Sequence, residues 1–426
     1  MAMGKYRIVG GRRLSGEVDI GGAKNAVLPI LAAVCLNKGE TVIKNCPPIL
    51  DTLASIEILT AIGCKVDFDP TDPEGELRVD ASGDLGHEIP EHIVSKMRSS
   101  ILFMGAMLGR LGKVEIALPG GCKLGARGID MHIAGLSKMG ATICLKDDKL
   151  TCHAERLHGA HIILPSPSVG ATENLMIAAV LAQGTTVIQN AACEPEIVDL
   201  AHFLLSLGAK IAGAGTDVIT ITGVEALQAS RPYGIMPDRI VAGTYLVAAA
   251  ITRGIITLRQ VCPISLAPVT AMLKAMGCQI HSGKNCVTLA APERLKPIDR
   301  LVTAVHPGFP TDMQAQFVAA LALADGVSVV RENIFESRYA HCVELNKMGA
   351  EIAIGEDNRE FTITGQELLF GEKVAAADLR GGAALVLAGL AACGETEVDN
   401  AHFIQRGYVG IEKDLRSLGA MIVYEA

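Results

Sequence analysis

The sequence predicts an α/β fold made from six copies of one unit of about 70 residues. The first observation is a pattern, Leu-x-x-(Ile/Met/Leu)-Gly-(Ala/Cys)-x-(Ile/Val), that occurs six times with its glycines 68 to 77 residues apart. The second is a glycine followed by a strand-like segment of alternating apolar residues, which lies upstream of every copy. Because this period is too long for a common solenoid, the copies indicate globular lobes.

Each copy of the pattern is interpreted as the end of an amphipathic helix, a glycine C-cap and the start of a strand. Glycine suits that place because the left-handed backbone at a helix end carries no penalty when Cβ is absent. The copies occupy residues 59–66, 136–143, 204–211, 273–280, 345–352 and 415–422, with the glycines Gly63, Gly140, Gly208, Gly277, Gly349 and Gly419.

The remaining segments complete the helix–strand alternation. The upstream strands are expected to follow Gly39, Gly112, Gly184, Gly254, Gly326 and Gly394. Alanine-rich segments that are apolar nearly all round predict buried helices over residues 171–182, 243–250, 315–324 and 381–392. Three units in each of two lobes is the natural division, since about 200 residues is an ordinary domain size, and ligand sites favour the cleft between domains.

Composition narrows the class of protein. The chain has 426 residues, a net charge of -8 and no Trp, which argues against a nucleic-acid binder. Its mean hydropathy is positive, yet the longest apolar stretches, such as residues 245–252, are far short of a membrane span, so no membrane association is expected. The first residues turn polar without an apolar leader, which predicts a cytoplasmic protein.

One of the twelve cysteines has a reactive setting. Cys122 lies in a glycine-rich loop over residues 118–128, between Lys123 and Arg127, and nearby cations stabilise a thiolate. A thiol that titrates near neutrality can act as an acid or a nucleophile. For the other eleven the sequence predicts small buried hydrophobic residues, because no pair forms a C-x-x-C unit and no cluster has zinc-like spacing.

Further segments interrupt the repeating apolar pattern with charged residues. Lys24 follows small residues that let a backbone approach a ligand, and Arg98 opens an apolar helix whose positive end suits an anion. Asp312 follows two prolines at a predicted helix start, where it is either a base or only a helix charge. The alternatives for the cations are a solvated lysine and a capping or ion-pairing arginine.

Three more arginines, Arg338, Arg380 and Arg406, lie in polar interruptions at similar places in the last repeats. Arginine forks match carboxylate and phosphate, although each one alone could equally form a surface ion pair. Equivalent loops of a repeat protein gather on one face, so these groups are expected to converge. Together they predict a small, highly charged substrate that carries phosphate and carboxylate.

At this point seven segments carry a family resemblance: Lys24-Asn25, residues 122–130, 168–174, 237–239 and 308–316, Asp378-Leu-Arg380 and Arg406-Gly. In order, over essentially the whole chain, they resemble the UDP-N-acetylglucosamine 1-carboxyvinyltransferases. The cysteine loop distinguishes this group from the related 3-phosphoshikimate enolpyruvyl transferases. The match is specific because it combines several separate motifs.

The resemblance implies a two-lobed inside-out α/β barrel with three repeats per lobe. The lobes would be residues 22–235 and residues 1–21 plus 236–426, with the active site in the cleft between them. It also implies transfer of the enolpyruvyl group of phosphoenolpyruvate to the 3'-hydroxyl of UDP-N-acetylglucosamine, through a tetrahedral intermediate. This is the first committed step of peptidoglycan synthesis, on which cell shape and division depend.

Residue roles follow from the resemblance by position. Cys122 would donate the proton to the methylene carbon, be able to form a covalent phosphoenolpyruvate adduct and react with fosfomycin, and Asp312 would be the base near the sugar hydroxyl. Lys24, Arg127 and Arg406 would hold the phosphate, and Arg338 and Arg380 the carboxylate. The UDP-sugar would be lined by Asn25, Arg98, Arg127, Gly128, Ile129, Asp130, Met131, Ser166, Pro167, Ser168, Val169, Asp312 and Ile334.

No metal or organic cofactor is implied. One departure from the family pattern is Gly128, which stands where a proline commonly follows the arginine of the cysteine loop; greater freedom there would weaken the pre-organisation of Arg127. Residues 231–236, before Pro237, are also unusual. The alternatives are a paralogue that uses another acceptor and a silent UDP-sugar-binding regulator.

Overall fold

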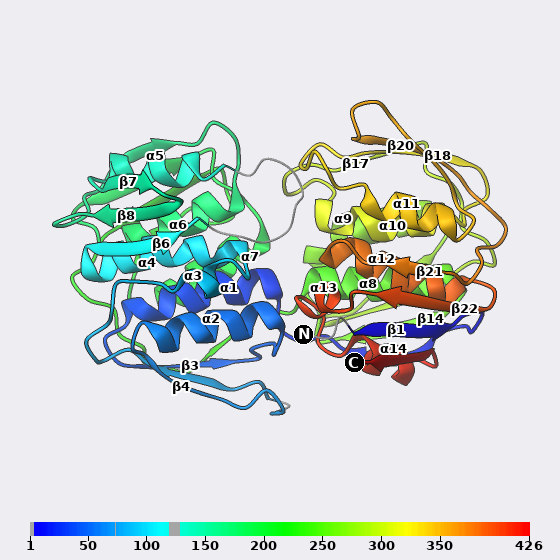
Figure 1. Cartoon of the computed structure of the whole chain (residues 1–426), viewed down its shortest axis with the longest axis horizontal. Helices are drawn as coiled ribbons and strands as arrows, with labels where there is room; N and C mark the ends of the chain where they lie inside the picture. Colours follow the sequence, from blue (N-terminus) through cyan, green and yellow to red (C-terminus); the bar gives the residue numbers. More distant parts are fainter. Residues whose placement is uncertain (1–3, 73, 119–127) are drawn as a thin grey trace. The chain divides into compact units, whose positions relative to one another are not determined.

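The computed structural model describes residues 4–72, 74–118 and 128–426 and shows a mixed α/β protein (Figure 1). The described residues divide into two compact units. We call residues 22–118 and 128–236 the N-terminal unit, and residues 4–21 and 237–426 the C-terminal unit. Each unit has its own hydrophobic core.

Three open sheets lie in the described part of the N-terminal unit. The first has the order β13 (Tyr233–Gly234), β3 (Glu40–Lys44), β5 (Leu77–Asp80) and β4 (Lys65–Phe68). The second has the order β6 (Lys113–Ala117), β8 (Lys149–His153) and β7 (Thr142–Lys146). The third has the order β11 (Lys210–Ala212), β12 (Val218–Thr222), β10 (Thr185–Gln189) and β9 (His161–Ile163).

The helices of this unit are α1 (Lys24–Ala33), η1 (Val34–Leu36), α2 (Leu50–Ala61), α3 (Glu91–Val94), η2 (Arg98–Ile101), α4 (Leu102–Leu111), α5 (Asp130–Lys138), α6 (Val169–Ala179) and α7 (Pro195–Ser206). Three of them, α1, α4 and α6, are buried along nearly their whole length. They pack against one another, and the sheets lie outside them (Figure 1). A helix that is apolar on every side requires such a cover.

The C-terminal unit also contains three open sheets among its described residues. They have the orders β15 (Gln279–Ser282), β16 (Cys286–Ala290), β14 (Ile255–Arg259), β2 (Ser15–Asp19); β17 (Arg300–Val302), β18 (Val327–Arg331), β20 (Glu360–Thr364), β19 (Glu351–Ile354); and β21 (Lys373–Ala375), β22 (Glu395–Asp399), β1 (Lys5–Val9), β23 (Met421–Glu425).

The helices of the C-terminal unit are η3 (Pro263–Leu266), α8 (Arg239–Ile251), α9 (Ala267–Ala275), η4 (Thr311–Met313), α10 (Gln314–Leu321), α11 (Ala340–Lys347), α12 (Leu379–Ala391), α13 (His402–Gln405) and α14 (Ile411–Ser417). Here α8, α10 and α12 are the buried helices, and they contact one another. The four alanine-rich segments named from the sequence all fall on buried helices, which confirms that prediction.

The sheet that contains β1 is completed by the chain's own beginning. In the sheet of β17, β18, β20 and β19, the strand that follows Gly326 is β18. It pairs antiparallel with β20, and β20 forms a hairpin with β19. In the sheet of β21 to β23 the corresponding place beside β22 is filled by β1, which pairs antiparallel with β22 and β23. The N-terminal strand β1 therefore takes the position that the hairpin strand β20 occupies in the sheet of β17 to β20.

The glycine pattern identified the helix ends correctly. All six pattern glycines have positive φ, between +91° and +103°, and each follows a helix and precedes a strand. The six strands expected after the upstream glycines are β3, β6, β10, β14, β18 and β22. This agreement follows from a conformational requirement that only glycine meets without strain.

The prediction for the cysteines was partly wrong. Of the eleven cysteines that the described residues contain, Cys144, Cys262 and Cys393 are exposed, and Cys193 and Cys286 are half-buried. Exposed positions at sheet surfaces and turns accept a small residue of any polarity, so neighbouring Ala, Val or Gly did not signal burial. No helix of the described chain is long and apolar enough to cross a bilayer.

Substitution of Gly208 measures the free-energy cost of a left-handed backbone conformation without any steric clash of the added side chain. Its φ is +98°, and nothing lies within 4 Å of the position that a Cβ would take. We expect Gly208→Ala to lower the free energy of unfolding by about 1 to 2 kcal/mol, measured by urea denaturation. Gly83→Ala is the matched control, because Gly83 also has open space but no positive φ. It should be neutral or slightly stabilising, and equal losses at both positions would contradict the explanation.

Candidate functional site

The loop of the predicted reactive cysteine lies outside the described residues, and with it Cys122, Lys123 and Arg127. The described residues on its two sides are the end of β6 and the start of α5. Arg98 lies close to this segment, because its Nη2 donates a hydrogen bond to the carbonyl oxygen of Gly128 at 3.3 Å. Arg98 is half-buried, and that burial lowers its pKa.

Lys24 is the first residue of α1 and is buried, with 9% of its surface exposed. Its Nζ lies 2.5 Å from Oδ2 of Asp51, which is buried in the first turn of α2. A buried ammonium needs such a partner because desolvation penalises an unpaired charge. The ion pair fixes the position of the Lys24 side chain at the start of α1.

Asn25 is half-buried in the same turn of α1. The residues after the cysteine loop differ in exposure: Gly128 and Asp130 are exposed, and Ile129 and Met131 are half-buried. At Gly128 an added Cβ would lie 2.2 Å from Oδ1 of Asp130, so glycine lets that carboxylate lie against the backbone. This close approach is a reason for glycine at position 128 that is separate from the freedom of the loop.

The predicted segment from Ser166 to Val169 leads into α6. Ser166 is exposed, while Pro167, Ser168 and Val169 are half-buried. The Ser168 hydroxyl caps the helix by accepting a hydrogen bond from the backbone N–H of Ala171 at 3.4 Å. The segment thus ends at a helix N-terminus, where unpaired N–H groups favour an anion.

Behind α5 a buried polar network joins three helices. Nδ2 of Asn174 on α6 donates to Nδ1 of His132 on α5 at 2.9 Å and to the carbonyl of Ile101 at 3.2 Å, while its Oδ1 accepts from the N–H of Gly105 on α4. Because the amide nitrogen only donates, Nδ1 of His132 must be an unprotonated acceptor. Burial lowers the pKa of His132 to about 4.

This lowered pKa predicts an acid-sensitive N-terminal unit. The unfolded chain binds the His132 proton below about pH 6.5 and the folded one only below about 4, so stability falls as the pH falls through that window, by roughly 1.4 kcal/mol per pH unit. We expect His132→Gln to flatten this dependence relative to the unchanged chain in urea denaturation from pH 7 to 4. Identical slopes for the two proteins would contradict the assignment.

In the C-terminal unit three predicted site residues meet. Oδ1 of Asp312 lies 3.0 Å from Nη2 of Arg338, and its Oδ2 lies 3.2 Å from Nη2 of Arg380. Both arginines are almost fully buried, with 4% and 2% of their surfaces exposed. Burial has the largest single effect on Arg380 and opposes its charge, but Asp312, Tyr408 and Asp238 together outweigh burial and raise the pKa of the guanidinium. One carboxylate therefore faces two guanidinium groups.

Local structure holds the three groups in place. Asp312 lies in η4 directly before α10, and Arg380 lies in the first turn of α12, whose N-terminus is capped by the Asp378 carboxylate. Nη1 of Arg338 donates to the Thr311 hydroxyl at 2.8 Å, and that hydroxyl donates to the buried Glu332 at 2.9 Å. Glu332 also accepts from the backbone N–H of Ile334 at 2.7 Å, so the same group shapes the Ile334 turn.

The two arginines retain unused donors. Within the described part of the chain, Nε of Arg338 and Nε and Nη1 of Arg380 are buried without a hydrogen-bond partner. The Arg380 guanidinium also lies over the ring of Tyr408, 5.5 Å from its centroid. Buried N–H groups without partners are costly, so their presence beside a carboxylate indicates a place for a second anion.

Removing the charge of Asp312 should reveal the free-energy cost of burying the guanidinium groups of Arg338 and Arg380 without a carboxylate. Asp312→Asn leaves two buried guanidinium groups without their carboxylate, and we expect a loss of roughly 3 kcal/mol in the free energy of unfolding, measured by urea denaturation. Asp325→Asn is the control, because Asp325 pairs with Arg294 at a similar 3.0 Å but is 71% exposed. It should change stability by less than about 1 kcal/mol. Comparable effects would show that the buried cluster does not depend on Asp312.

Two further residues of the predicted site belong to this unit. Arg406 directly follows α13 and is half-buried, and Ile334 is 36% exposed. Asp238 caps α8 through hydrogen bonds to the N–H groups of Ile240 and Val241, at 2.7 and 2.9 Å. Its capping role gives the Pro237-Asp238-Arg239 motif a structural function.

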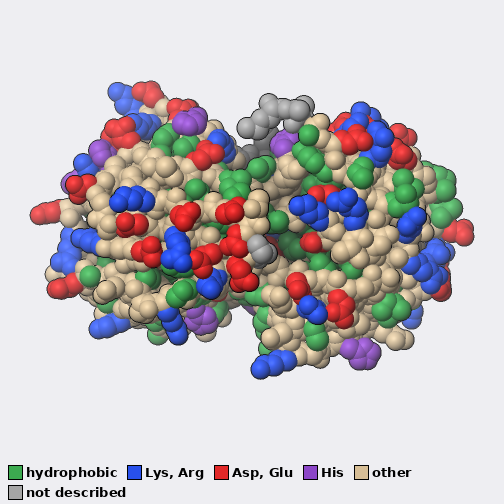
Figure 2. All heavy atoms as spheres, turned by 90° about the horizontal axis from the view of Figure 1, so that it is seen from below, with side chains coloured by type: hydrophobic (Ala, Val, Ile, Leu, Met, Phe, Trp, Pro, Cys, Tyr) green, Lys and Arg blue, Asp and Glu red, His purple; other side chains and the backbone are tan. Residues whose placement is uncertain are grey.

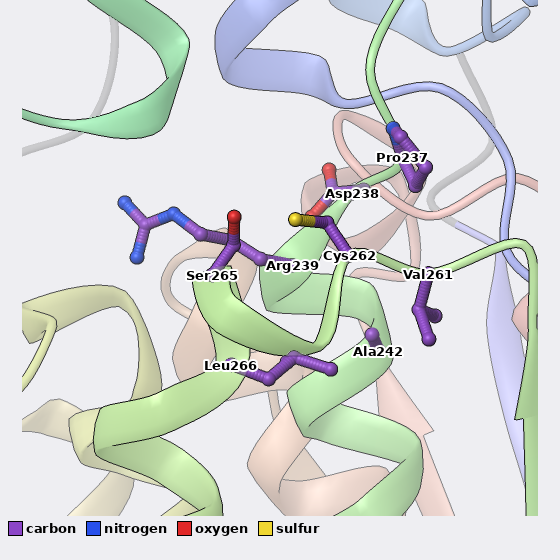
Figure 3. A pocket seen from close by; sticks show the side chains of 8 residues that line it. All are labelled: Pro237, Asp238, Arg239, Ala242, Val261, Cys262, Ser265 and Leu266. Atoms are coloured by element: carbon purple, nitrogen blue, oxygen red, sulfur yellow. The ribbon is translucent and has the colours of Figure 1, made fainter. Parts of the chain in front are cut away.

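A small hollow opens beside that motif. The space between its walls is about 170 Å³ and includes open solvent, so the hollow encloses no ligand-sized cavity. It is lined by Pro237, Asp238, Arg239, Ala242, Val261, Cys262, Ser265 and Leu266. Figure 3 shows the Cys262 thiol beside Asp238, with the Arg239 guanidinium extending away. The hollow contains neither Asp312 nor its arginines, so it is not the predicted site.

On the face shown in Figure 2, acidic and basic side chains are interspersed without a continuous basic area. Within the described residues His87, Glu88 and Glu115 form one group with metal-compatible spacing. However, Glu115 is already neutralised by Lys149, whose hydrogen bond lowers the pKa of the Glu115 carboxyl.

Sequence reasoning assigned no role to the residues that support the predicted ones. These are Asp51, Asn174, Thr311, Glu332 and Tyr408. Asn174 and Thr311 lie in the segments 168–174 and 308–316 that carry the resemblance, but their partners are set by contacts that the sequence does not show. Glu332 directly follows β18 and stands between Arg331 and Asn333, so its polar sequence surroundings gave no signal that the carboxylate is buried.

Comparison with known proteins covers the whole chain. The sequence model of EPSP synthase (3-phosphoshikimate 1-carboxyvinyltransferase) matches residues 8–415. A UDP-N-acetylglucosamine 1-carboxyvinyltransferase 2 from Caldanaerobacter subterraneus subsp. tengcongensis is 49% identical over 421 residues, 99% of each chain. The UDP-N-acetylglucosamine 1-carboxyvinyltransferase of Dichelobacter nodosus is 46% identical over 420 residues, again 99% of each chain.

Solved structures show the same architecture. The enolpyruvyl transferase NikO from Streptomyces tendae superposes with a TM-score of 0.89 at 26% identity, over 100% of this chain and 99% of that chain. EPSP synthase from Acinetobacter baumannii gives a TM-score of 0.73 at 18% identity, over 99% and 100% of the two chains. The second likeness shows the fold alone.

Proposed function

The chain belongs to the enolpyruvyl transferases of the EPSP synthase family and, within it, to the UDP-N-acetylglucosamine 1-carboxyvinyltransferases, and from this we propose its reaction. It transfers the enolpyruvyl group of phosphoenolpyruvate to the 3'-hydroxyl of UDP-N-acetylglucosamine and releases phosphate. The product enters peptidoglycan synthesis, on which cell shape and division depend. The observation that carries this conclusion is 46 to 49% identity over nearly the full chain.

The buried arginines support the binding of phosphoenolpyruvate. Its carboxylate would accept from Arg338 and Arg380, whose nitrogens Nε of Arg338 and Nε and Nη1 of Arg380 lack partners within the described residues. Bidentate arginine recognition fits a planar carboxylate. Lys24, Arg127 and Arg406 would hold the phosphate, and the Asp51 partner keeps the Lys24 ammonium in a fixed position.

Asp312 is proposed as the base at the sugar hydroxyl. Two guanidinium groups hold its carboxylate ionised, which a proton acceptor requires. The 3'-oxygen forms a bond to C2 of phosphoenolpyruvate as its proton passes to the base, and the methylene carbon C3 accepts a proton from Cys122. The carboxylate also stabilises the oxocarbenium character that develops at C2.

The second half of the reaction reverses the proton movement. A proton leaves the methyl carbon of the tetrahedral intermediate as the C2–O bond to phosphate breaks, which restores the carbon–carbon double bond in the product. The cations around the phosphate stabilise the leaving group. Side chains supply every proton and charge in this route, so it requires no metal or organic cofactor.

The UDP-sugar would be lined by Asn25, Arg98, Arg127, Gly128, Ile129, Asp130, Met131, Ser166, Pro167, Ser168, Val169, Asp312 and Ile334. Support comes from the Arg98 contact to Gly128 and from the capped N-terminus of α6, which both favour a diphosphate. We also propose lobes of residues 22–235 and 1–21 plus 236–426, each an inside-out α/β barrel of three repeats. The nucleotide substrate places the reaction in the cytoplasm.

The direct test measures phosphate release. We expect release only when phosphoenolpyruvate and UDP-N-acetylglucosamine are both present, and none with shikimate 3-phosphate as acceptor. Release with a different nucleotide sugar in preference to UDP-N-acetylglucosamine would assign the chain to a paralogue in another pathway. Binding of UDP-N-acetylglucosamine without turnover would indicate a silent regulator.

Variants test the two proposed proton-transfer groups. Cys122→Ser and Asp312→Ala should each lower kcat by about 100-fold or more, because a positioned acid or base contributes roughly 10² to 10⁴. The exposed Cys144 provides the matched control, since Cys144→Ser should leave kcat unchanged. Full activity in both site variants would show that the roles are wrong. Mass spectrometry after fosfomycin should find one adduct, at Cys122, and an adduct elsewhere would contradict its assignment.

A further inference from the structure

Asn174 is a buried polar residue that has no part in the proposed reaction. It lies near the middle of α6, and 0% of its surface is exposed. Burying a side-chain amide is costly unless its donors and its acceptor are hydrogen-bonded. The partners of the Asn174 amide therefore determine what this residue does in the core of the N-terminal unit.

One part of the amide holds the junction between η2 and α4. Nδ2 of Asn174 donates to the carbonyl of Ile101, the last residue of η2, at 3.2 Å, and Oδ1 accepts from the N–H of Gly105, in the first turn of α4, at 2.8 Å. A Cβ added at Gly105 would overlap Oδ1 of Asn174, so glycine is required for this approach. The amide thus fixes the end of the short helix η2, which begins at Arg98.

The second hydrogen of the amide holds α5. Nδ2 of Asn174 also donates to Nδ1 of His132, in the first turn of α5, at 2.9 Å. The imidazole ring in turn lies against the start of α6, because a Cβ added at Gly170 would lie 3.5 Å from Cε1 and 3.6 Å from Nε2 of His132. A Cβ added at Gly135 of α5 would lie 2.5 Å from the Leu175 side chain of α6, so these two helices pack closely. The first turns of α5 are therefore fixed to α6.

The elements that Asn174 joins are those that carry most of the residues proposed for the UDP-sugar in this unit. Arg98 begins η2, residues 128–131 include the start of α5, and residues 166–169 lead into α6. The helices α4, α5 and α6 are neighbours in Figure 1 and in the contacts of the core. Each of the three segments thus lies within about two helical turns of a group that is hydrogen-bonded to Asn174 or of Asn174 itself.

From this arrangement we propose that Asn174 is a positioning residue for the UDP-sugar, which holds the starts of η2, α5 and α6 in the geometry that binds the nucleotide. The inference rests on the proposed function, since that function assigns these segments to the UDP-sugar. Both hydrogens and the oxygen of the amide are used within the core, so Asn174 acts through these segments. A binding site loses affinity when the residues that support it are removed, even if no contact to the ligand is lost.

Asn37 provides a matched control in the same unit. It is also a buried asparagine, with 2% of its surface exposed, and its Nδ2 donates to the carbonyl of Glu40 at 3.1 Å and to the hydroxyl of Thr41 at 2.9 Å. Asn37 lies between η1 and β3, and these two hydrogen bonds are local to that turn. Asn37→Ala therefore removes comparable buried hydrogen bonds outside the segments proposed for the UDP-sugar.

Calorimetric titration of the full-length protein with UDP-N-acetylglucosamine at pH 7, without phosphoenolpyruvate, tests the proposal. We expect Asn174→Ala to raise the Kd and the KM for UDP-N-acetylglucosamine by about tenfold or more, because small displacements of positioning groups are costly. The KM for phosphoenolpyruvate, measured at saturating UDP-sugar, should change by less than about twofold. Asn37→Ala should lower the urea midpoint as Asn174→Ala does, but it should bind UDP-N-acetylglucosamine like the unchanged chain.

Asn174→Asp separates hydrogen bonding from packing and replaces Asn174→Ala if that variant does not fold. An ionised Asp has nearly the same shape and can accept from Gly105, but it cannot donate to Ile101 or His132. We expect it to weaken UDP-N-acetylglucosamine binding by about fivefold or more as well.

The outcomes distinguish this role from the proposed function. Affinities of the Asn174 variants that equal that of Asn37→Ala would overturn the positioning role, and so would equal losses for UDP-N-acetylglucosamine and phosphoenolpyruvate. In both cases phosphate release by the unchanged chain would leave the proposed function standing. An unchanged chain that neither binds UDP-N-acetylglucosamine nor releases phosphate would overturn the proposed function, and the positioning role with it.

Discussion

Helices that are apolar on every side impose the main constraint on this protein. α1, α4 and α6 in one unit, and α8, α10 and α12 in the other, are buried along nearly their whole length and have to be covered by sheets. Their sides therefore carry few polar groups, and those present, such as Asn174 of α6, are hydrogen-bonded within the core. Polar residues concentrate at the helix N-terminal ends instead, as in Lys24 of α1, Ser168 before α6, Asp312 before α10 and Arg380 of α12. The same ends favour anions.

The carboxylate of Asp312, directly before α10, is an example of a reactive group at a helix N-terminus. Two buried guanidinium groups would be costly alone, and one carboxylate between them compensates only part of their hydrogen-bonding capacity. A substrate anion can supply the rest. Asp312 thus neutralises part of the cluster's charge but leaves arginine N–H groups without a partner among the described residues. In the proposed function the carboxylate of phosphoenolpyruvate accepts from these N–H groups.

Much of the fold could be predicted because its signals are local. The pattern glycines, such as Gly208, mark helix ends through their own φ angles, and the strand after each upstream glycine follows from alternation within five residues. The meeting of Asp312 with Arg338 and Arg380 is different, because it depends on contacts over 26 and 68 residues that no local rule encodes. The exposure of Cys144 was missed for the same reason, because it depends on which distant segments cover that strand.

The place of β1 has a consequence for how the chain is made. Its partners β22 and β23 lie far along the chain, with 392 positions between Lys5 of β1 and Glu397 of β22, so β1 stays unpaired while the intervening segment is synthesised. Residues 22–236 form a continuous segment with a core of its own and can collapse much earlier. The N-terminus must therefore remain free of other sheet edges during synthesis, and the charged Lys5 and Arg7 on β1, which lie among acidic partners in the finished sheet, discourage premature pairing.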